Sequence, residues 1–454
     1  NLMAVVVVGD ISSEEALRYV QKHFSGLKNP AQPRVRDYAV VPPYTNSNAM
    51  VVADKEATGF EFSVNFPARA IKPTTTLGEY RADLIRNLYI SLLNNRFREL
   101  TQKADPPFVF AAAGFESYAR YHESFNISGS TGTQDVQKGL QAAMTEIERV
   151  KRFGFTTPEL ERAKKNILTA YERQWNNRDK TESAVYADEY IRNFTAQEPI
   201  PGIDNEFTYV KEMLPGIQLS EVNALTDLYR NEKNKFAYIT GLENDEKYKL
   251  PAVAAINSVI QNVEKDASIK AYEEKVIATN LLTSTPQAGK VTRTSRNALL
   301  GSTELTLSNG VTVTLKSTDF KNDQILFSTT RYGGLTAYTV EDKYSAENAT
   351  TVVGSMGFGS FSPTDMRKAM AGKSIAVNPV IGPYTAGFSG SSSKKDLENF
   401  FQLFHLSVTE PRRDSALYKS FLQRSKAQVA MLSANPQIAF IDTLYQVLYE
   451  NNPL

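Results

Sequence analysis

Cysteine is absent from this 454-residue sequence, and histidine occurs only three times. The absence of cysteine excludes disulfide bonds and thiolate ligands for a metal. No two of the histidines, His23, His122 and His405, are four residues apart, which is the spacing that places two metal ligands on one face of a helix. The sequence therefore contains no histidine pair of that kind.

An excess of charge of either sign is also lacking. Lys and Arg number 51 and Asp and Glu number 50, which leaves a net charge of +1 at pH 7. This balance gives no electrostatic footprint for nucleic acid or an anionic membrane. The longest apolar run, in residues 1–10 (NLMAVVVVGD), is well below the roughly 18 residues of a membrane-spanning helix. We therefore expect neither a nucleic-acid partner nor a membrane span.

Residues 1–10 begin a strand-turn-helix pattern that occurs twice. The run of valines is typical of a fully buried strand, and a helix capped by Ser12 or Ser13 is expected to follow it. Residues 235–266 repeat this pattern, with a strand at 236–240 and a helix at 251–263. The match predicts that the start of the chain is the tail of an earlier unit.

A longer internal repeat relates the middle of the chain to its last part. The tripeptide Ser128-Gly129-Ser130 aligns with Ser389-Gly390-Ser391 at an offset of 261 residues, and the similarity continues without a gap to Gln141 and Gln402. Further on, Lys164 aligns with Lys426 at an offset of 262 residues. Repeats of this length indicate that the fold is built from related units.

The repeats predict one complete unit between two partial units. The third unit opens with a hairpin in which Asn309-Gly310 is expected to supply positive backbone dihedrals. Both chain ends are interpreted as interior cuts in a longer polypeptide. The predicted segments are a tail of the first unit at 1–35, the second unit at 36–266, a linker at 267–298 and an incomplete third unit at 299–454. The strands expected in the second unit are 49–53, 60–66, 108–116 and 121–129, and its helices are 77–100, 135–153 and one starting at 158.

Four motifs in this order resemble the insulinase/pitrilysin (inverzincin) family of zinc metallopeptidases. They are NLMAVVVVGDIS at 1–12, NLYISLLNNRFREL at 87–100, GFTTPELERAKKNIL at 154–168 and LTLSNGVTVTL at 305–315. The resemblance implies an α+β fold of repeated units, each an antiparallel sheet packed with helices. It also implies a clamshell of four units in two halves that encloses peptide substrates.

The resemblance implies zinc chemistry that this chain cannot supply. The family holds zinc with H-x-x-E-H on a helix and a distal glutamate, and the motif glutamate activates water. In the third unit that helix would be near 345–356, which contains Glu347 but no histidine. We therefore expect a catalytically silent third unit, zinc ligands outside this chain, and no catalytic, cofactor-binding or metal-binding residue within it.

The expected parent protein is a zinc-dependent metalloendopeptidase that hydrolyses peptides or unfolded proteins, and this fragment alone is expected to be inactive. Its other partners would be the missing units or a paired subunit. Two alternatives remain open at this point: a non-catalytic partner or scaffold subunit, and a peptide-binding protein. A periplasmic or secreted location is the favoured prediction.

The remaining polar candidates are assigned structural roles. His122 and Glu123 are adjacent in a strand and should face opposite sides. The segments SGSTGT and SGSSSKK do not fit a phosphate-loop pattern, so they are interpreted as strand-to-helix turns. The charges of 160–180 are expected to form a solvated face opposite a buried stripe. The stripe comprises Leu160, Ile167, Tyr171 and Trp175. Three aromatic residues that could line a chamber wall, Phe115, Tyr118 and Tyr121, are given no functional role, because core packing explains them equally well.

Overall fold

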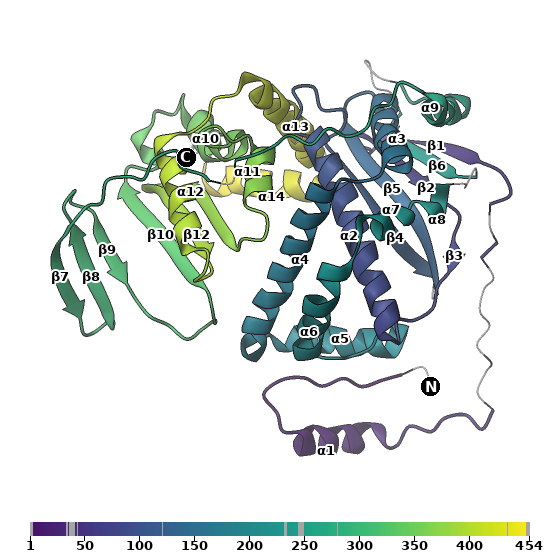
Figure 1. Cartoon of the computed structure of the whole chain (residues 1–454), viewed down its shortest axis with the longest axis horizontal. Coiled ribbons are helices and arrows are strands. Elements are labelled where there is room, and N and C mark those ends of the chain that lie inside the picture. Colours follow the sequence, from purple (N-terminus) through teal and green to yellow (C-terminus); the bar gives the residue numbers. More distant parts are fainter. Residues whose placement is uncertain are drawn as a thin grey trace.

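The computed structural model describes residues 3–32, 35, 41–42, 44–119, 121–230, 234–243, 249–278, 280–433 and 435–450. The predicted boundaries at residues 36 and 454, and Asn1-Leu2 of the first predicted strand, lie outside the described residues. Two lobes, each a sheet with helices, are joined by a long segment, and helix α1 (Ser13–Phe24) lies apart from both (Figure 1). This is the expected α+β class.

The first lobe contains the sheet predicted for the second unit. Its strands are arranged in the order β1-β6-β2-β5, with β4 on the free side of β5 and the short β3 also paired with β5. Strand β1 is parallel to β6, and the other pairs are antiparallel. The bounds are β1 Asn48–Asp54, β2 Phe60–Asn65, β3 Arg69–Ala70, β4 Phe110–Ala119, β5 His122–Gly132 and β6 Phe236–Leu242.

One face of this sheet carries the main hydrophobic core. Phe60, Phe62 and Val64 of β2 are almost completely buried in this core. Helix α2 (Leu77–Leu100) has the predicted bounds because Thr76 and Glu79 form a capping box at its start. The other helices of this lobe are α3 Val136–Phe153, α4 Thr157–Asn176, α5 Ser183–Ala196, α6 Ile203–Met213, α7 Leu219–Ala224, α8 Asp227–Arg230 and α9 Val253–Lys265.

The second lobe contains a smaller sheet of order β10-β12-β11 and a separate three-stranded sheet of order β7-β8-β9. A smaller core that includes Phe358, Phe361 and Leu403 also receives Leu281 from the segment between the lobes. The strands are β7 Val291–Asn297, β8 Ser302–Leu307, β9 Thr312–Leu315, β10 Ile325–Tyr332, β11 Ile375–Ile381 and β12 Thr385–Ser392. The helices are α10 Lys343–Met356, α11 Pro363–Ala369, α12 Leu397–Thr409, α13 Ser415–Ser433 and α14 Pro436–Leu448.

The sequence repeat corresponds to equivalent positions in the two sheets. Ser128 of β5 faces Ser63 on one side and Ala112 on the other, and Ser389 of β12 faces Ser328 and Asn378 in the same way. The two Ser-Gly-Ser tripeptides therefore lie within central strands, so their interpretation as strand-to-helix turns was wrong. Both strands still lead into a helix, which explains why the pattern resembled a turn.

The glycine of each tripeptide is required by packing. A Cβ on Gly129 would lie 2.5 Å from the Phe62 ring, and a Cβ on Gly390 would lie 2.4 Å from the carbonyl oxygen of Ala376. Real Cβ atoms do not come this close to neighbouring atoms, so any side chain would force the strands apart. The repetition of glycine therefore has a structural cause in both sheets.

We expect Gly129→Ala to destabilise the first lobe by about 1–3 kcal/mol, the usual range for overpacking. Urea unfolding followed by the fluorescence of Trp175, the single tryptophan, would measure this loss. Gly216→Ala is the matched control, because a Cβ there would meet nothing within 4 Å. Equal stabilities of the two variants would contradict the packing explanation.

The first predicted strand is absent. Residues 3–8 form no strand, and Met3, Val5 and Val7 are largely exposed. An apolar run becomes a strand only where another strand edge accepts its backbone hydrogen bonds, and residues 3–8 pair with none in the described part of the chain. The helix predicted after them does form as α1, with the Ser12 hydroxyl accepting the Glu15 N–H.

The segment predicted as a linker, 267–298, contains a strand, β7, which pairs with β8. One expectation in the second lobe requires correction. In the predicted hairpin only Gly310 has a positive φ, of 85°. Leu307 and Val311 close a three-residue loop, because the Leu307 N–H bonds the Val311 carbonyl and the Gly310 N–H bonds the Leu307 carbonyl.

Candidate functional site

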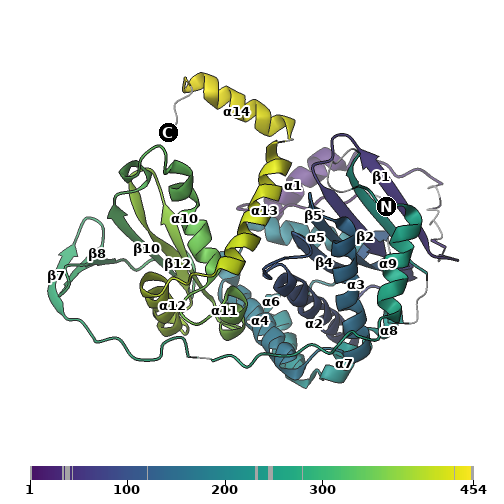
Figure 2. The ribbon, with the colours of Figure 1, turned by 90° about the horizontal axis from the view of Figure 1, so that it is seen from above.

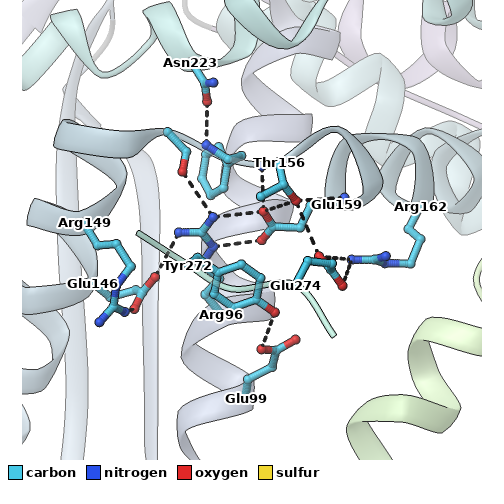
Figure 3. Close-up of polar contacts among 12 residues, drawn as sticks. Arg96, Glu99, Glu146, Arg149, Thr156, Glu159, Arg162, Asn223, Tyr272 and Glu274 are labelled. Atoms are coloured by element: carbon cyan, nitrogen blue, oxygen red, sulfur yellow. Dashed lines mark hydrogen bonds and ion pairs between the residues drawn. The ribbon is translucent and has the colours of Figure 1, made fainter. Parts of the chain in front are cut away.

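A buried arginine joins three helices of the first lobe (Figure 3). The side chain of Arg96 on α2 is only 2% exposed. Its Nε and Nη2 donate to the two carboxylate oxygens of Glu159 at 2.8 and 2.9 Å, and its Nη1 donates to Glu146 at 3.1 Å. The bidentate contact with α4 and the single contact with α3 fix the guanidinium in one orientation.

Local sequence explains how Glu159 comes to face Arg96. Glu159 is the third residue of α4 and accepts the backbone N–H of Thr156 at 2.8 Å in a capping box. Burial disfavours its charge, but Arg96 and Thr156 outweigh burial and hold the pKa of Glu159 below its ordinary value. The aromatic rings of Phe155 and Tyr272 lie 4.9 and 4.3 Å from the guanidinium carbon. Arg96, Glu146 and Glu159 therefore form a buried cluster of paired charges with a structural role, called the Arg96 cluster below.

The Arg96 cluster continues into the contact between the lobes. Tyr272, from the segment between the lobes, donates its hydroxyl to Glu99 at 2.8 Å. Lys368 on α11 of the second lobe donates to the Tyr272 hydroxyl at 2.8 Å, and it lies 2.8 Å from Glu99 and 3.3 Å from Glu274. Arg162 holds Glu274 from the other side, with two contacts of 3.0 and 2.9 Å. These ion pairs fasten the connecting segment and the second lobe to α2 and α4.

Lys368 is charged in this contact. Burial disfavours its ammonium, but the hydrogen bonds to Glu99 and Tyr272 outweigh burial and raise the pKa of Lys368. An ammonium held in this way acts as a fixed positive charge between carboxylates. It is suited to joining surfaces and unsuited to proton transfer near neutral pH.

A cavity of about 890 Å³ lies between the outer face of the large sheet and helices of the second lobe. Figure 2 shows α13 beside β5, between the two lobes. The floor is a single cross-strand row with one residue from each of five strands. These are Val52, Thr240, Glu61, Ser130 and Phe110, and the opposite side includes Thr351 and Ser355 of α10 and Phe421, Arg424 and Ser425 of α13.

Arg424 stands out among the residues that line this cavity. Its Nε is buried and has no hydrogen-bond partner in the described structure. Burial lowers the pKa of Arg424, and no carboxylate opposes that effect. Asp54, Glu56 and Glu61 line the same cavity. Among the described residues, none of these three forms an ion pair with Arg424. The cavity is therefore lined by one arginine and three acidic residues that do not pair with it in the described structure.

Comparisons with known proteins show which proteases this chain resembles. The model of the peptidase M16 inactive domain matches residues 1–167, which include Arg96, Glu146 and Glu159. The zinc protease PQQL-like of Arabidopsis thaliana is 25% identical over 425 residues, covering 93% of this chain and 41% of that protein. Residues 1–167 therefore match a peptidase M16 domain, and the chain resembles zinc proteases of that type.

Two solved M16-type structures share the fold along nearly the whole chain. The periplasmic protease PqqL from Escherichia coli superposes with a TM-score of 0.52 and 17% identity, covering 97% of this chain and 48% of that one. The ferredoxin protease FusC, solved as a mutant with Arabidopsis ferredoxin, superposes with a TM-score of 0.56 and 18% identity, covering 96% and 48%. The chain thus spans about half the length of these relatives.

The fold does not bring the three histidines of this chain together. His23 is exposed in the last turn of α1, His122 is half-buried on β5, and His405 is half-buried on α12. As expected from strand alternation, Glu123 next to His122 is buried, where it accepts hydrogen bonds from Arg69 and Arg86. Within the described ranges no three His, Cys, Asp or Glu side chains form a group that could hold a metal ion.

Sequence reasoning missed the buried ion cluster. The charges of 160–180 were expected on a solvated face, but Arg162 is half-buried against Glu274. Glu159, just before this stretch, is 7% exposed. The available signal was the T-x-x-E capping box at Thr156, which places a carboxylate in the first turn of a helix whose apolar face is buried. The stripe opposite is buried at Leu160 and half-buried at Tyr171 and Trp175.

The proposed wall aromatics also have structural partners. Phe115 packs against Phe125 and Tyr89 in the core, and the Tyr121 hydroxyl donates to Gln197 at 2.7 Å. The side chain of Tyr118 lies outside the described residues. None of the helices in the described part of the chain has the length and apolar character needed to cross a membrane.

Proposed function

We propose that this chain is the central, non-catalytic part of a zinc metalloendopeptidase that hydrolyses peptides or unfolded proteins in a clamshell chamber. The observation that carries the proposal is a repeated M16-type unit joined to a second unit by buried ion pairs around Glu99, Tyr272 and Lys368. In this proposal the chain supplies a rigid wall and the joint between units. The proposed division is a first-unit tail at 1–35, a second unit at 36–266, a linker at 267–298 and a silent third unit at 299–454.

Zinc enters the proposal through the M16 relatives named as zinc proteases. The residues of this chain do not fit a zinc site, since the three histidines lie on α1, β5 and α12 and the described acidic side chains add no suitable group. The zinc ligands are therefore placed in the part of the parent protein outside this chain, and no catalytic step is assigned to residues here.

A periplasmic or secreted location is part of the same proposal. It is supported by the E. coli relative, which is described as a periplasmic protease. The proposed partners are a peptide substrate together with the other units of the polypeptide or a paired subunit.

The test compares the full-length polypeptide with the 454-residue chain. We expect the full-length protein to contain H-x-x-E-H, to retain about one zinc per molecule after dialysis, and to cleave a quenched fluorescent peptide in a chelator-sensitive manner. The 454-residue chain alone should neither retain zinc nor cleave the peptide. Stoichiometric tightly bound zinc in the chain would contradict the proposal. A full-length protein without zinc and without hydrolysis would instead favour the alternative of a scaffold or peptide-binding subunit.

A further inference from the structure

A small cavity lies where α11 of the second lobe meets α2 and α4 of the first lobe, and we call it the joint cavity. Its volume is about 50 Å³. A cavity needs roughly 10–15 Å³ to hold one water molecule, so the joint cavity has room for a compact group of a few heavy atoms. Figure 3 shows three residues on its first-lobe side, Glu99, Glu159 and Arg162.

One charged side chain of the joint cavity differs from the others because the protein gives it no partner. The remaining charged residues of the cavity are all paired, as Glu159 with Arg96, Glu99 with Lys368, and Arg162 with Glu274. Arg367 of α11 forms neither an ion pair nor a hydrogen bond with any described residue. The joint cavity therefore contains one positive charge that the described residues do not balance.

The surroundings of Arg367 disfavour its charge. The side chain is half-buried, and burial and the neighbouring Arg98 lower the pKa of Arg367 by more than Glu99 raises it. An arginine nevertheless stays protonated in proteins, so this charge persists without the hydrogen bonds it would have in water. Unlike the Nε of Arg424, no nitrogen of Arg367 is among the fully buried atoms that lack a partner in the described structure. An ion in the cavity can therefore reach the Arg367 guanidinium.

Two asparagines on the opposite side of the joint cavity offer neutral donors. The Oδ1 of Asn95 on α2 accepts a hydrogen bond from Arg98 at 3.1 Å, and the Oδ1 of Asn166 on α4 accepts the Gly372 N–H at 2.8 Å. Each side-chain oxygen is thus engaged, while the Nδ2 groups donate to none of the described residues. The cavity therefore combines one unpaired cation with two spare amide donors.

The shape of this donor set favours a tetrahedral oxyanion. A guanidinium presents its N–H groups as a planar fork that fits two oxygens of a phosphate or sulfate ion. The remaining oxygens of such an ion point in other directions, so they can accept from donors on α2 and α4. The joint cavity is far smaller than the roughly 300–1,000 Å³ of sites for larger ligands. A bare ion therefore fits, and a nucleotide or a peptide does not.

We propose that the joint cavity binds one small tetrahedral oxyanion, phosphate or sulfate, which bridges α11 of the second lobe to α2 and α4 of the first. Arg367 supplies the positive charge, and Asn95 and Asn166 donate from the first lobe. The ion completes the contact between the lobes at the one charged group that the described side chains leave unpaired. This inference goes beyond the proposed function and does not depend on zinc or on peptide hydrolysis.

Calorimetric titration of the 454-residue chain with sodium sulfate tests the site. The ionic strength is held constant with sodium chloride, so general screening of charge does not contribute to the heat. We expect a single saturable site with a dissociation constant of roughly 1 mM or below, and inorganic phosphate should compete for it. Absence of saturable binding of both oxyanions at millimolar concentration would overturn the proposal.

Variants locate the ion at Arg367. Arg367→Met should bind sulfate about tenfold or more weakly, since a charge-assisted hydrogen bond is lost. Arg367→Lys keeps the charge but not the planar fork, so its affinity should be intermediate. Arg293→Met is the matched control, because Arg293 is exposed on β7, which does not line the joint cavity, and it should bind like the wild type. Unchanged affinity in Arg367→Met would refute the assignment.

Loss of the second donor type is tested separately in Asn95→Ala. This variant should bind sulfate about threefold more weakly, because a neutral hydrogen bond contributes less than one from a charged group. Equal affinity of Asn95→Ala and the wild type would show that the ion does not reach α2, and the proposed bridge between the lobes would fail.

The stability of Arg367→Met distinguishes an ion site from a structural role. In chloride the variant should unfold at the same urea concentration as the wild type or at a higher one, because it removes a half-buried charge beside Arg98. In saturating sulfate the wild type should gain stability relative to the variant, since an ion that binds only the folded state stabilises it. The general stabilising effect of sulfate acts on both proteins and cancels in this comparison.

A structural role would give the opposite pattern. Arg367 lies in the last turn of α11, where the helix dipole favours a cation. If that were its only role, Arg367→Met would be less stable than the wild type by the same amount in chloride and in sulfate. That result would overturn the proposed oxyanion site.

Discussion

Arg96→Met is expected to lower the free energy of unfolding by about 3–5 kcal/mol, the usual cost of breaking a buried ion pair. The substitution keeps much of the side-chain length but removes the cation between Glu159 and Glu146. Glu159, at 7% exposure, would lose its ion pair while remaining buried, whereas Glu146, at 2% exposure, would keep its ion pair with Arg149. Urea unfolding followed by Trp175 fluorescence reports the loss directly, because Trp175 lies on α4 with Glu159.

Arg18→Met is the control for removing an arginine ion pair. Arg18 bonds Glu15 at 3.3 Å on the surface of α1, where its side chain is 68% exposed. Surface pairs of this kind contribute at most about 1 kcal/mol. A loss in Arg96→Met no larger than in Arg18→Met would show that the buried cluster does not stabilise the lobe.

The destabilisation by Arg96→Met should depend on pH. Because the pKa of Glu159 is lowered by folding, the stability that its ionised form contributes is present at neutral pH and is lost as the pH falls through the folded-state pKa. In the variant, acid also protonates the carboxylates that Arg96 no longer balances. We therefore expect the stability difference between wild type and variant to be largest near pH 7 and to shrink below about pH 4. A difference that grows in acid would contradict this sign.

Local signals explain the elements that sequence predicted well. The predicted bounds of α2 agree with the structure, in which the neighbouring residues Thr76 and Glu79 cap its start. The repeat predicted that β5 and β12 are equivalent, and their registers agree. Capping, periodicity and repetition all depend on neighbours in the sequence or on internal comparison, so they can be seen without a structure.

Non-local contacts explain what sequence did not predict. Residues 3–8 have the composition of a strand, but a strand also requires a paired edge. The partners of Arg96 are 50 and 63 residues away, and no periodic pattern relates Glu146 to Glu159 across α2. The cavity is assembled from one row of five strands and two helices of the other lobe. Its charge arrangement therefore depends on how the lobes meet.

Lys368→Met is expected to weaken the attachment of the second lobe. Lys368 is 13% exposed and is the group of α11 that meets Glu99 and Tyr272 of the first lobe and the connecting segment. Without it Glu99 would lose an ion pair, while Glu274 would keep its contact with Arg162. We expect a loss of about 2–4 kcal/mol, somewhat less than for Arg96→Met because Lys368 is more exposed, at 13% against 2% for Arg96.

A double-mutant cycle between Lys368→Met and Glu99→Gln tests whether this loss belongs to the contact between the lobes. If the two side chains stabilise each other, the summed losses of the two single variants should exceed the loss of the double variant by about 1–3 kcal/mol in urea unfolding. Lys316→Met, an exposed lysine after β9, is the matched control and should add independently to Glu99→Gln. Additive effects of Lys368→Met and Glu99→Gln would show that the ion pair does not couple the lobes. Coupling of the expected size would mean that this lysine contributes to holding the two units in a fixed relation, which is the rigidity that the proposed chamber wall requires.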